Sequence, residues 1–220
     1  MTAPAAVLWR HGRTAYNSEL RLQGQVDIPL DAVGCWQAQA AATALSTACR
    51  PTRIISSDLQ RARATAQYLA ELVDLPVDLD ARLRERDFGQ WEGLARDEII
   101  DRWPEEHAAW VRGEEPARAG AETRDAVASR VGAALAEHLG MLERGQTLIV
   151  VSHGAAITLA LTHLLELEPE TWRGLAGLDN AHWSELHASA SHARPRWRLV
   201  RHNIGPMLPG VDWNSGPSSA

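Results

Sequence analysis

Three continuous apolar runs, each bounded by polar residues, lie far apart along the chain. They read A-A-V-L-W at 5–9, R-I-I-S at 53–56 and T-L-I-V-V-S at 147–152. Continuous apolar character, in place of alternation with polar residues, is typical of strands that are buried on both faces. The pattern therefore predicts three strands in the interior of a sheet.

Helical periodicity accompanies these runs. One series follows Ser56, with apolar residues three and four positions apart: Leu59, Ala62, Ala66 and Leu69. A second precedes the last run and consists of Val127, Val131, Leu135, Leu139 and Leu142. Asp58 stands where it would cap the first helix, and Gly145 breaks the chain before the last strand. Strands alternating with helices predict a mainly parallel sheet with helices on both faces.

Two segments depart from this alternation. Between about 88 and 120 the pattern is irregular and rich in Trp, Glu, Pro and Gly, which predicts an insertion beside the sheet that acts as a lid. The last stretch, 203–220, is rich in Gly, Pro and Ser, as is typical of a loosely ordered tail. We therefore expect one domain over 1–202, including the lid insertion, and a C-terminal tail.

Composition narrows the possible partners and chemistry. The net charge of −6 argues against nucleic acid as a main partner, because binding a phosphate backbone requires a positive field. All 22 basic residues are arginine. Without lysine the chain has no phosphate-loop lysine, no Schiff-base lysine and no kinase strand lysine. A local arginine cluster can still bind a small anion.

The cysteines and the N-terminus bear on location. Cys35 and Cys49 form neither a C-x-x-C pair nor a disulfide framework, which favours a reducing cytoplasm. The N-terminal apolar run ends at Arg10 without a basic region before it, and no segment reaches the roughly 18 apolar residues of a membrane span. We expect a cytoplasmic protein without a membrane partner.

The carboxyl ends of the three predicted strands carry polar side chains. They read R-H-G at 10–12, S-S-D at 56–58 and S-H-G at 152–154, and Arg61 follows one turn into the next helix. The carboxyl ends of parallel strands lie at one edge of a sheet, where ligands bind. Arg61 lies near the positive end of a helix dipole, and the planar guanidinium of Arg10 matches phosphate oxygens. Together these features predict a phosphate site.

Two histidines at this edge are each followed by glycine, which lets a phosphate approach the backbone. A neutral His11 would attack phosphorus through one ring nitrogen while the other nitrogen is held as a donor. His153, if cationic, would balance the charge on the transferring phosphoryl group. Either histidine alone is a weak signal, because a strand-end histidine is more often structural. Their occurrence together with Arg61 favours catalysis.

An alcohol leaving group also needs a general acid. The stretch L-R-E-R-D-F-G-Q-W-E-G at 83–93 offers Glu85, whose apolar neighbours Leu83 and Phe88 would keep it protonated for donation. Asp87 and Glu92 are rivals that spacing alone does not exclude.

Other side chains carry weaker signals. His182, His187 and His192 are five residues apart, which fits one face of neither a helix nor a strand, so we predict no metal site. The tryptophans are expected in packing, although one could stack on a sugar ring. Four arginines are expected to be solvated or salt-bridged: Arg21, Arg63, Arg82 and Arg84.

Five motifs occur in order between about 7 and 160: R-H-G-R-T-A-Y-N, L-Q-G-Q-V-D-I-P-L, S-S-D-L-Q-R-A-R-A-T-A, L-R-E-R-D-F-G-Q-W-E-G and V-S-H-G-A. Together they resemble the histidine phosphatase superfamily, also called phosphoglycerate mutase-like. The resemblance implies a three-layer α/β/α sandwich, a covalent phosphohistidine on His11, and no metal or organic cofactor. It further implies Glu85 as proton donor and a phosphate pocket made of Arg10, Arg61, His153, Asn17, Gln23 and Gly24.

The substrate is a small phosphorylated metabolite in this interpretation. The segment L-R-E-R-D-F-G, where cofactor-dependent mutases tend to carry an L-N-E-R-H-Y-G type sequence and a larger insertion, favours hydrolysis over mutase activity. G-L-A-G-L-D-N-A-H-W-S-E-L at 174–186 and R-W-R-L at 196–199 resemble the actinobacterial glucosyl-3-phosphoglycerate phosphatases, which are homodimers. A phosphoglycerate mutase and a broad-specificity acid phosphatase remain alternatives. A non-catalytic phosphate-binding module is disfavoured because His11 and Glu85 are both present.

Overall fold

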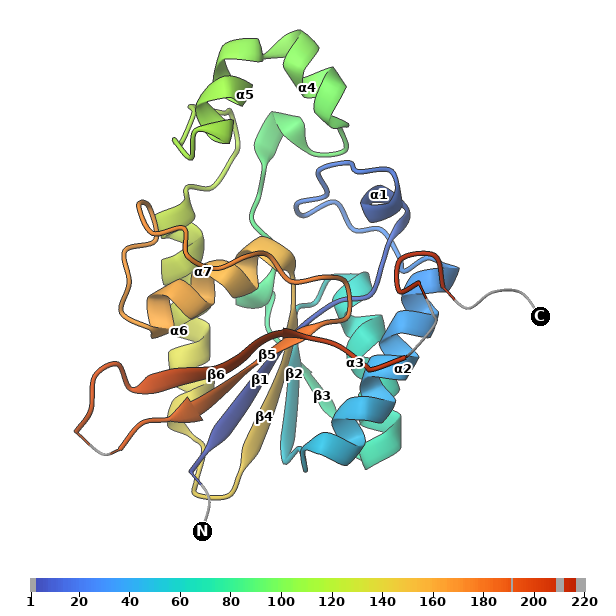
Figure 1. Ribbon diagram of the computed structural model, residues 1–220, viewed down its shortest axis with the longest axis vertical. Coiled ribbons are helices and arrows are strands. Elements are labelled where there is room, and N and C mark those ends of the chain that lie inside the picture. The colour runs from blue at the N-terminus through green and yellow to red at the C-terminus, as the bar shows by residue number, and fades with distance from the viewer. Residues whose placement is uncertain (1–2, 191, 209–211, 217–220) are drawn as a thin grey trace.

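The computed structural model describes residues 3–190, 192–208 and 212–216. Its strands are β1 (Ala5–Arg10), β2 (Arg53–Ser56), β3 (Val77–Leu79), β4 (Thr147–Ser152), β5 (Trp183–Ala188) and β6 (Trp197–Ile204). They form one sheet in the order β3-β2-β4-β1-β5-β6 (Figure 1). Strands β3, β2, β4 and β1 are parallel, whereas β5 is antiparallel to β1 and β6. The three predicted strands and the mainly parallel sheet are confirmed.

Helices cover both faces of the sheet. They are α1 (Ala15–Ser18), α2 (Ala32–Ala48), α3 (Gln60–Val73), α4 (Arg96–Arg102), α5 (Pro104–Val111), α6 (Arg124–Gly140) and α7 (Gly154–Leu164), with short 3-10 turns η1 (Ala81–Leu83) and η2 (Gly89–Trp91). Alternate residues of β1 separate the two cores: Ala6 and Leu8 pack with α6 and α7, whereas Val7 and Trp9 pack with α2 and α3. The result is a three-layer sandwich (Figure 1). Among the described residues, no helix has the length and apolar character that crossing a bilayer requires.

The start of α3 differs from the prediction. Asp58 does not cap this helix, because its carboxylate is paired with Arg84 at 2.5 Å. The backbone amide of Gln60 instead donates to the carboxylate of Asp27 at 2.8 Å, from a distant part of the chain. Asp27, which tertiary folding brings to the start of α3, thus takes the capping role predicted for Asp58. Arg61 lies in the first turn of α3, as the sequence predicts.

The insertion is more ordered than its irregular pattern indicates. It contains η2, α4 and α5 and lies above the carboxyl edge of the sheet (top of Figure 1). Pro104 is the first residue of α5, a position that proline favours in helices. Phe88, Trp91 and Ile99 form a separate apolar cluster under these helices. The insertion therefore has a small core of its own, and its closure over a substrate stays a prediction.

The C-terminal part also corrects the predicted boundary. Strand β6 continues to Ile204, so a boundary at 202 would cut the strand. Residues 212–216 fold back onto the domain: the ring of Trp213 packs against Trp36 and His182, with centroids 5.0 and 5.4 Å away. The predicted loosely ordered tail is therefore wrong for 212–216, because the ring contacts of Trp213 and its hydrogen bond to the carbonyl of Asn180 hold that segment. The predicted tail's other residues at 209–211 and 217–220 lie outside the described residues.

Candidate active site

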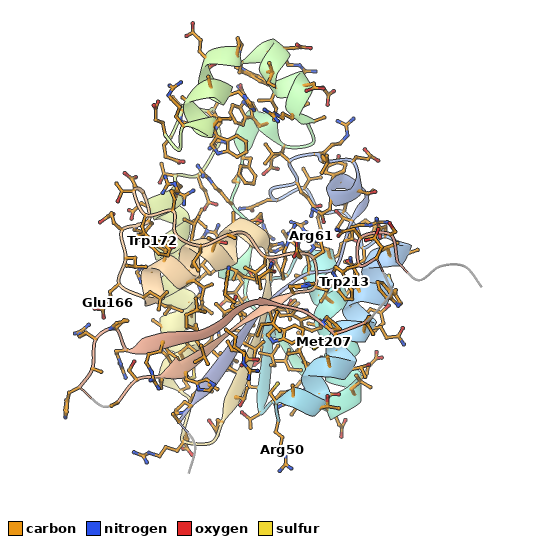
Figure 2. The ribbon with its side chains drawn as sticks, viewed as in Figure 1. Arg50, Arg61, Glu166, Trp172, Met207 and Trp213 are labelled. Atoms are coloured by element: carbon orange, nitrogen blue, oxygen red, sulfur yellow. The ribbon has the colours of Figure 1, made fainter. Side chains whose placement is uncertain are left out.

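A cavity of about 680 Å³ opens at the carboxyl edge of the sheet. Its wall contains all but one of the residues that the sequence predicts for the site: Arg10, His11, Asn17, Gln23, Gly24, Arg61 and Glu85. His153 lies directly behind, with its ring centroid 5.0 Å from that of His11. Arg61, which lines this cavity, is labelled near the centre of the molecule in Figure 2. The fold thus gathers in one place side chains separated by up to 143 positions, from Arg10 to His153.

The ring of His11 is held in one tautomer. Its Nδ1 lies 2.7 Å from the carbonyl oxygen of Gly12. A carbonyl oxygen only accepts, so Nδ1 carries the proton and Nε2 carries the lone pair. Burial, reinforced by Arg61 and Arg10, lowers the pKa of His11 well below its usual 6.5. The result is a neutral imidazole whose Nε2 is a competent nucleophile at neutral pH.

Gly12 permits the close approach of the loop after β1 to helix α2. A Cβ at Gly12 would lie 2.3 Å from the carbonyl oxygen of Gly34, which no real contact allows. The backbone amide of Gly12 donates to the hydroxyl of Thr65 at 3.1 Å, and that hydroxyl donates to the carbonyl of Arg61 at 2.8 Å. These contacts fix the position of His11 relative to α3.

His153 is completely buried. Its Nε2 lies 2.9 Å from the hydroxyl of Ser57, and its Nδ1 has no hydrogen-bond partner among the described residues. Burial and then Arg61 lower the pKa of His153 well below 6.5. The structure therefore favours a neutral His153 in place of the cation considered from the sequence, since the neighbouring guanidinium groups repel a second positive charge.

Two arginines supply the positive charge of the site: Arg61 is buried and Arg10 is partly buried. Arg61 donates to the carbonyls of Val26 and Gly24 at 2.8 and 2.7 Å, and Arg10 donates to the carbonyl of Leu178. Burial lowers the pKa of Arg61 to about 10, so it remains charged at neutral pH. The Nε of Arg10 is buried and has no partner among the described residues. Two cations against the single carboxylate of Glu85 leave an excess positive charge that favours an anion.

The polar loop around Gly24 orients the Arg61 guanidinium. In the orientation of the Gln23 amide that satisfies both of its groups, the oxygen accepts from Arg61 and the nitrogen donates to Thr14. Gly24 has a φ of +54°, and a Cβ there would lie 1.8 Å from the carboxylate of Glu92. A side chain here would displace the Glu92 carboxylate, so glycine is favoured at this position.

Backbone amides hold the Glu85 carboxylate, and of the two apolar side chains expected beside it Phe88 lines the same cavity whereas Leu83 does not. The carboxylate accepts from the amides of Ala155 and Ala156, at 3.1 and 2.8 Å, and from that of Arg86 at 2.9 Å. Leu83 packs in the core of the α6 and α7 layer, and Phe88 packs in the insertion. The carboxyl group is thus placed at the N-terminus of α7, facing the cavity.

The rival carboxylates serve the structure of the loop. Asp87 accepts from the amide of Gly89 at 2.7 Å, and Glu92 accepts from the amide of Gln25 at 2.8 Å. Glu85 is the acidic residue in the cavity wall among the described residues. Of the three carboxylates that spacing alone leaves as candidates for the acid, Glu85 lies in the cavity wall, whereas Asp87 and Glu92 do not.

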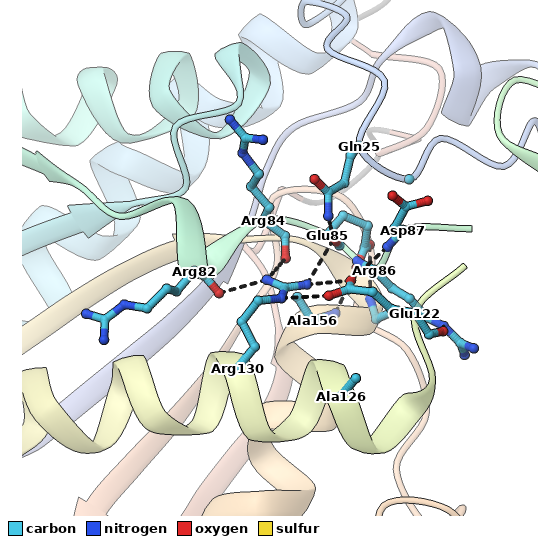
Figure 3. Close-up of polar contacts among 12 residues, drawn as sticks. Gln25, Arg82, Arg84, Glu85, Arg86, Asp87, Glu122, Ala126, Arg130 and Ala156 are labelled. Atoms are coloured by element: carbon cyan, nitrogen blue, oxygen red, sulfur yellow. Dashed lines mark hydrogen bonds and ion pairs between the residues drawn. The ribbon is translucent and has the colours of Figure 1, made fainter. Parts of the chain in front are cut away.

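Arg130 supports Glu85 and was not singled out from the sequence. From α6 it donates to the carbonyls of Arg82, Arg84 and Glu85 at 2.8, 3.0 and 3.3 Å, and its ion pair with Glu122 is 2.7 Å long (Figure 3). The guanidinium thereby fixes the backbone that carries Glu85. The sequence does contain a signal for this role. Arg130 lies next to Val131 in the apolar series of α6, and a charged side chain at such a position requires polar partners.

Two asparagines in the cavity wall, Asn180 and Asn214, are also not identified by the sequence patterns. Asn180 donates to the side-chain oxygen of Asn17 at 3.1 Å and to the carbonyl of His11 at 3.3 Å. Asn214, from the C-terminal segment, lines the cavity, and its carbonyl accepts from Arg13. Nothing in the sequence near Asn214 indicates a place in the site, because only the folding back of this segment brings it there.

The remaining expectations concern charged surface residues. Arg21, Arg82 and Arg84 form ion pairs, as predicted, and Arg63 is exposed. His182 packs edge-on against Trp213. In the described part of the chain, no three His, Cys, Asp or Glu side chains gather in a way that could hold a metal ion.

Comparison with known proteins agrees with this geometry. A family model of the histidine phosphatase superfamily (branch 1) matches residues 6–205. Glucosyl-3-phosphoglycerate phosphatase of Mycobacterium tuberculosis is 38% identical over 94% of this chain and 98% of its own length. A probable phosphoglycerate mutase of Salmonella choleraesuis is 40% identical over 73% of this chain and 74% of its own length.

Solved structures show the same similarity. Mycobacterial glucosyl-3-phosphoglycerate phosphatase in complex with VO3 superposes with a TM-score of 0.83 at 37% identity, covering 91% of this chain and 99% of that one. Phosphoserine phosphatase of Entamoeba histolytica in complex with 3-phosphoglyceric acid has a TM-score of 0.76 at 28% identity, covering 90% and 95%.

Proposed function

Because this chain belongs to the histidine phosphatase superfamily, branch 1, and is a phosphatase, we propose that it cleaves phosphate monoesters through a phosphohistidine on His11. The observation that carries this proposal is the neutral imidazole of His11, with Nδ1 bound to a backbone carbonyl, beside the guanidinium groups of Arg10 and Arg61. Neither a metal nor an organic cofactor takes part in the proposed reaction.

In the first step Nε2 of His11 bonds to phosphorus, and the bond from phosphorus to the alcohol oxygen breaks. Glu85 gives a proton to that oxygen. In the second step water attacks the phosphohistidine, Glu85 takes its proton, and His11 leaves as a neutral ring. Arg10 and Arg61 stabilise the equatorial oxygens during both transfers.

We propose glucosyl-3-phosphoglycerate as the substrate. The relatives that carry this name are 36–38% identical and cover 92–94% of this chain, whereas the probable mutases cover 73%. A cavity of about 680 Å³ has space for a sugar acid beyond its phosphate. The second candidate is a phosphoglycerate mutase, favoured by the 40% identity to the probable mutases. A mutase would require priming by a bisphosphate, and a hydrolase would not.

A substrate panel tests the proposal. Phosphate release would be measured in the presence of a chelator from glucosyl-3-phosphoglycerate, 3-phosphoglycerate and p-nitrophenyl phosphate, for wild type and His11→Ala. His192→Ala, which removes an exposed histidine, is the matched control. Preference for the glucosylated compound, lost in His11→Ala and kept in the control, would support substrate and nucleophile together. Activity that survives in His11→Ala would overturn the mechanism.

We also propose that the protein is a cytoplasmic homodimer. The free thiols Cys35 and Cys49 support a reducing compartment. Strand β6 forms an edge of the sheet, and its Val200 is 47% exposed, which supports pairing with a second copy there. Sedimentation at micromolar concentration tests the assembly, and a single species with the mass of one chain would contradict it.

A further inference from the structure

A second cavity, of about 250 Å³, adjoins the catalytic one. The two cavities share three wall residues: Gly154, Ala155 and Gly177. A Cβ at Gly177 would have no atom within 4 Å, so the wall between the cavities carries no side chain at that point. The two cavities therefore adjoin at a part of the wall where Gly177 leaves open space. We call this second cavity the arginine pocket, after the three arginines that line it: Arg86, Arg124 and Arg173.

The arginine pocket has an excess of positive charge. Arg86 is buried and pairs with Glu115 at 2.5 Å. Arg124 and Arg173 form no ion pair within the described ranges; both donate to the carbonyl of Pro169, at 3.0 and 3.1 Å. Burial, followed by repulsion from Arg173 and Arg86, lowers the pKa of Arg124. The carboxylates of Glu115 and Glu170 act on this group of three cations, which leaves one positive charge in excess and makes the pocket a site for an anion.

Arg124 is the residue best placed to bind that anion. Its Nε donates to Pro169, whereas its two terminal nitrogens make no hydrogen bond to any described residue and are not shut off from solvent. Arg173 differs, because its terminal nitrogens already donate to the carbonyls of Pro169, Trp172 and Gly113. A planar guanidinium with two free donors on its far side matches the two oxygens of a carboxylate.

An aromatic ring lies beside these cations. Trp172 lines the arginine pocket (labelled in Figure 2). A Cβ at Gly174 would lie 2.4 Å from the Trp172 ring, so glycine at 174 lets the backbone pack directly against the indole. A fixed indole next to a cation suits a polyol attached to an acid, since sugar rings stack on aromatic faces.

We propose that the arginine pocket binds the carboxylate of a phosphorylated hydroxy acid while its phosphate lies at His11, with Arg124 as the principal ligand. This inference rests on the proposed function and names the class of substrate it takes. The site selects phosphate monoesters that carry a second, carboxylate charge over monoesters of neutral alcohols. Arg124 acts on binding and takes no part in phosphoryl transfer.

The test compares two substrates that differ in one group. The ratio of kcat/KM for 3-phosphoglycerate to that for glycerol phosphate would be measured for wild type and Arg124→Gln. Arg144→Gln, which removes an exposed arginine in the turn before β4, is the matched control. Wild type and control should favour 3-phosphoglycerate, and Arg124→Gln should lower the ratio by about tenfold or more, because a charge-assisted pair is lost. The kcat for p-nitrophenyl phosphate should not change.

An unchanged ratio in Arg124→Gln would overturn the inference, as would a wild type without preference for the acid. If wild type hydrolyses none of these compounds, the proposed function fails, and calorimetry then tests the pocket alone. Wild type should bind 3-phosphoglycerate about tenfold or more tightly than glycerol phosphate, and Arg124→Gln should bind the two alike. Equal affinities in wild type would overturn the inference independently of catalysis.

Discussion

Lowering the pH from about 7.5 to about 5.5 should destabilise this protein through the two buried imidazoles of the candidate site, His11 and His153. Burial and the neighbouring arginines hold the pKa values of His11 and His153 well below 6.5 in the folded protein. In the unfolded chain both rings take up a proton near pH 6.5. Below that pH the unfolded state therefore binds more protons than the folded state, and stability falls as the pH falls.

The magnitude follows from proton linkage. A ring that stays neutral in the folded protein lowers the free energy of unfolding by about 1.4 kcal/mol over this interval, so the pair accounts for about 2.7 kcal/mol. This is a large share of the roughly 5–15 kcal/mol that stabilises a typical domain. Urea unfolding at both pH values, followed by tryptophan fluorescence, measures it for wild type and for a variant carrying His11→Asn and His153→Asn.

The comparison is made within each protein across pH, so any general loss of stability in the variant cancels. Wild type should lose about 2.7 kcal/mol more than the double variant. His192→Asn, at an exposed position, should lose as much as wild type. Equal losses in wild type and in the double variant would refute the reasoning, because the two rings would then titrate alike in the folded and unfolded states.

Four further predictions concern the surroundings of these rings. Gly12→Ala should lower the rate of phosphate release by at least about tenfold, because its Cβ would lie 2.3 Å from a carbonyl oxygen of α2; an unchanged kcat would contradict this. Arg130→Met should cost about 2–3 kcal/mol of unfolding free energy in urea, because three carbonyls and a carboxylate lose a charged donor. Asp27→Ala should lower the melting temperature more than Asp58→Ala, since Asp27 accepts the first amide of α3 while Asp58 forms a part-exposed ion pair; the reverse order would argue against this capping role. Glu85→Gln should lose activity on alkyl phosphates yet still release p-nitrophenol, which leaves without a proton, and equal losses on both would disprove its role as the acid.

The positions of the three central strands, and the edge of the sheet at which the candidate site lies, could be predicted from the sequence. Strands buried on both faces are continuous apolar runs, so their carboxyl ends are visible as the first polar residues after each run. Arg10, His11 and His153 follow such runs directly, and Arg61 follows one helical turn later. A parallel sheet must then bring these ends together.

Contacts between distant segments could not be predicted in this way. The amides that hold Glu85 belong to residues 155 and 156, and the sequence around Glu85 indicates only its apolar neighbours. Asp27 takes the capping position that local spacing assigns to Asp58. Trp213 lies in a segment whose composition is typical of disorder, yet its partly buried indole packs against Trp36 and donates to the carbonyl of Asn180. In each case long-range contacts outweigh the local pattern.

The hydrogen bond between Nδ1 of His11 and the carbonyl of Gly12 has a stereochemical consequence. Under the proposed mechanism it leaves Nε2 as the atom that carries the phosphoryl group, so the imidazole covers one side of phosphorus throughout. The alcohol must depart, and water must arrive, on the opposite side. Each in-line transfer inverts the configuration at phosphorus, and two inversions restore it. A phosphorothioate monoester carrying two oxygen isotopes, hydrolysed in water enriched in the third, should therefore yield inorganic thiophosphate with retained configuration at phosphorus.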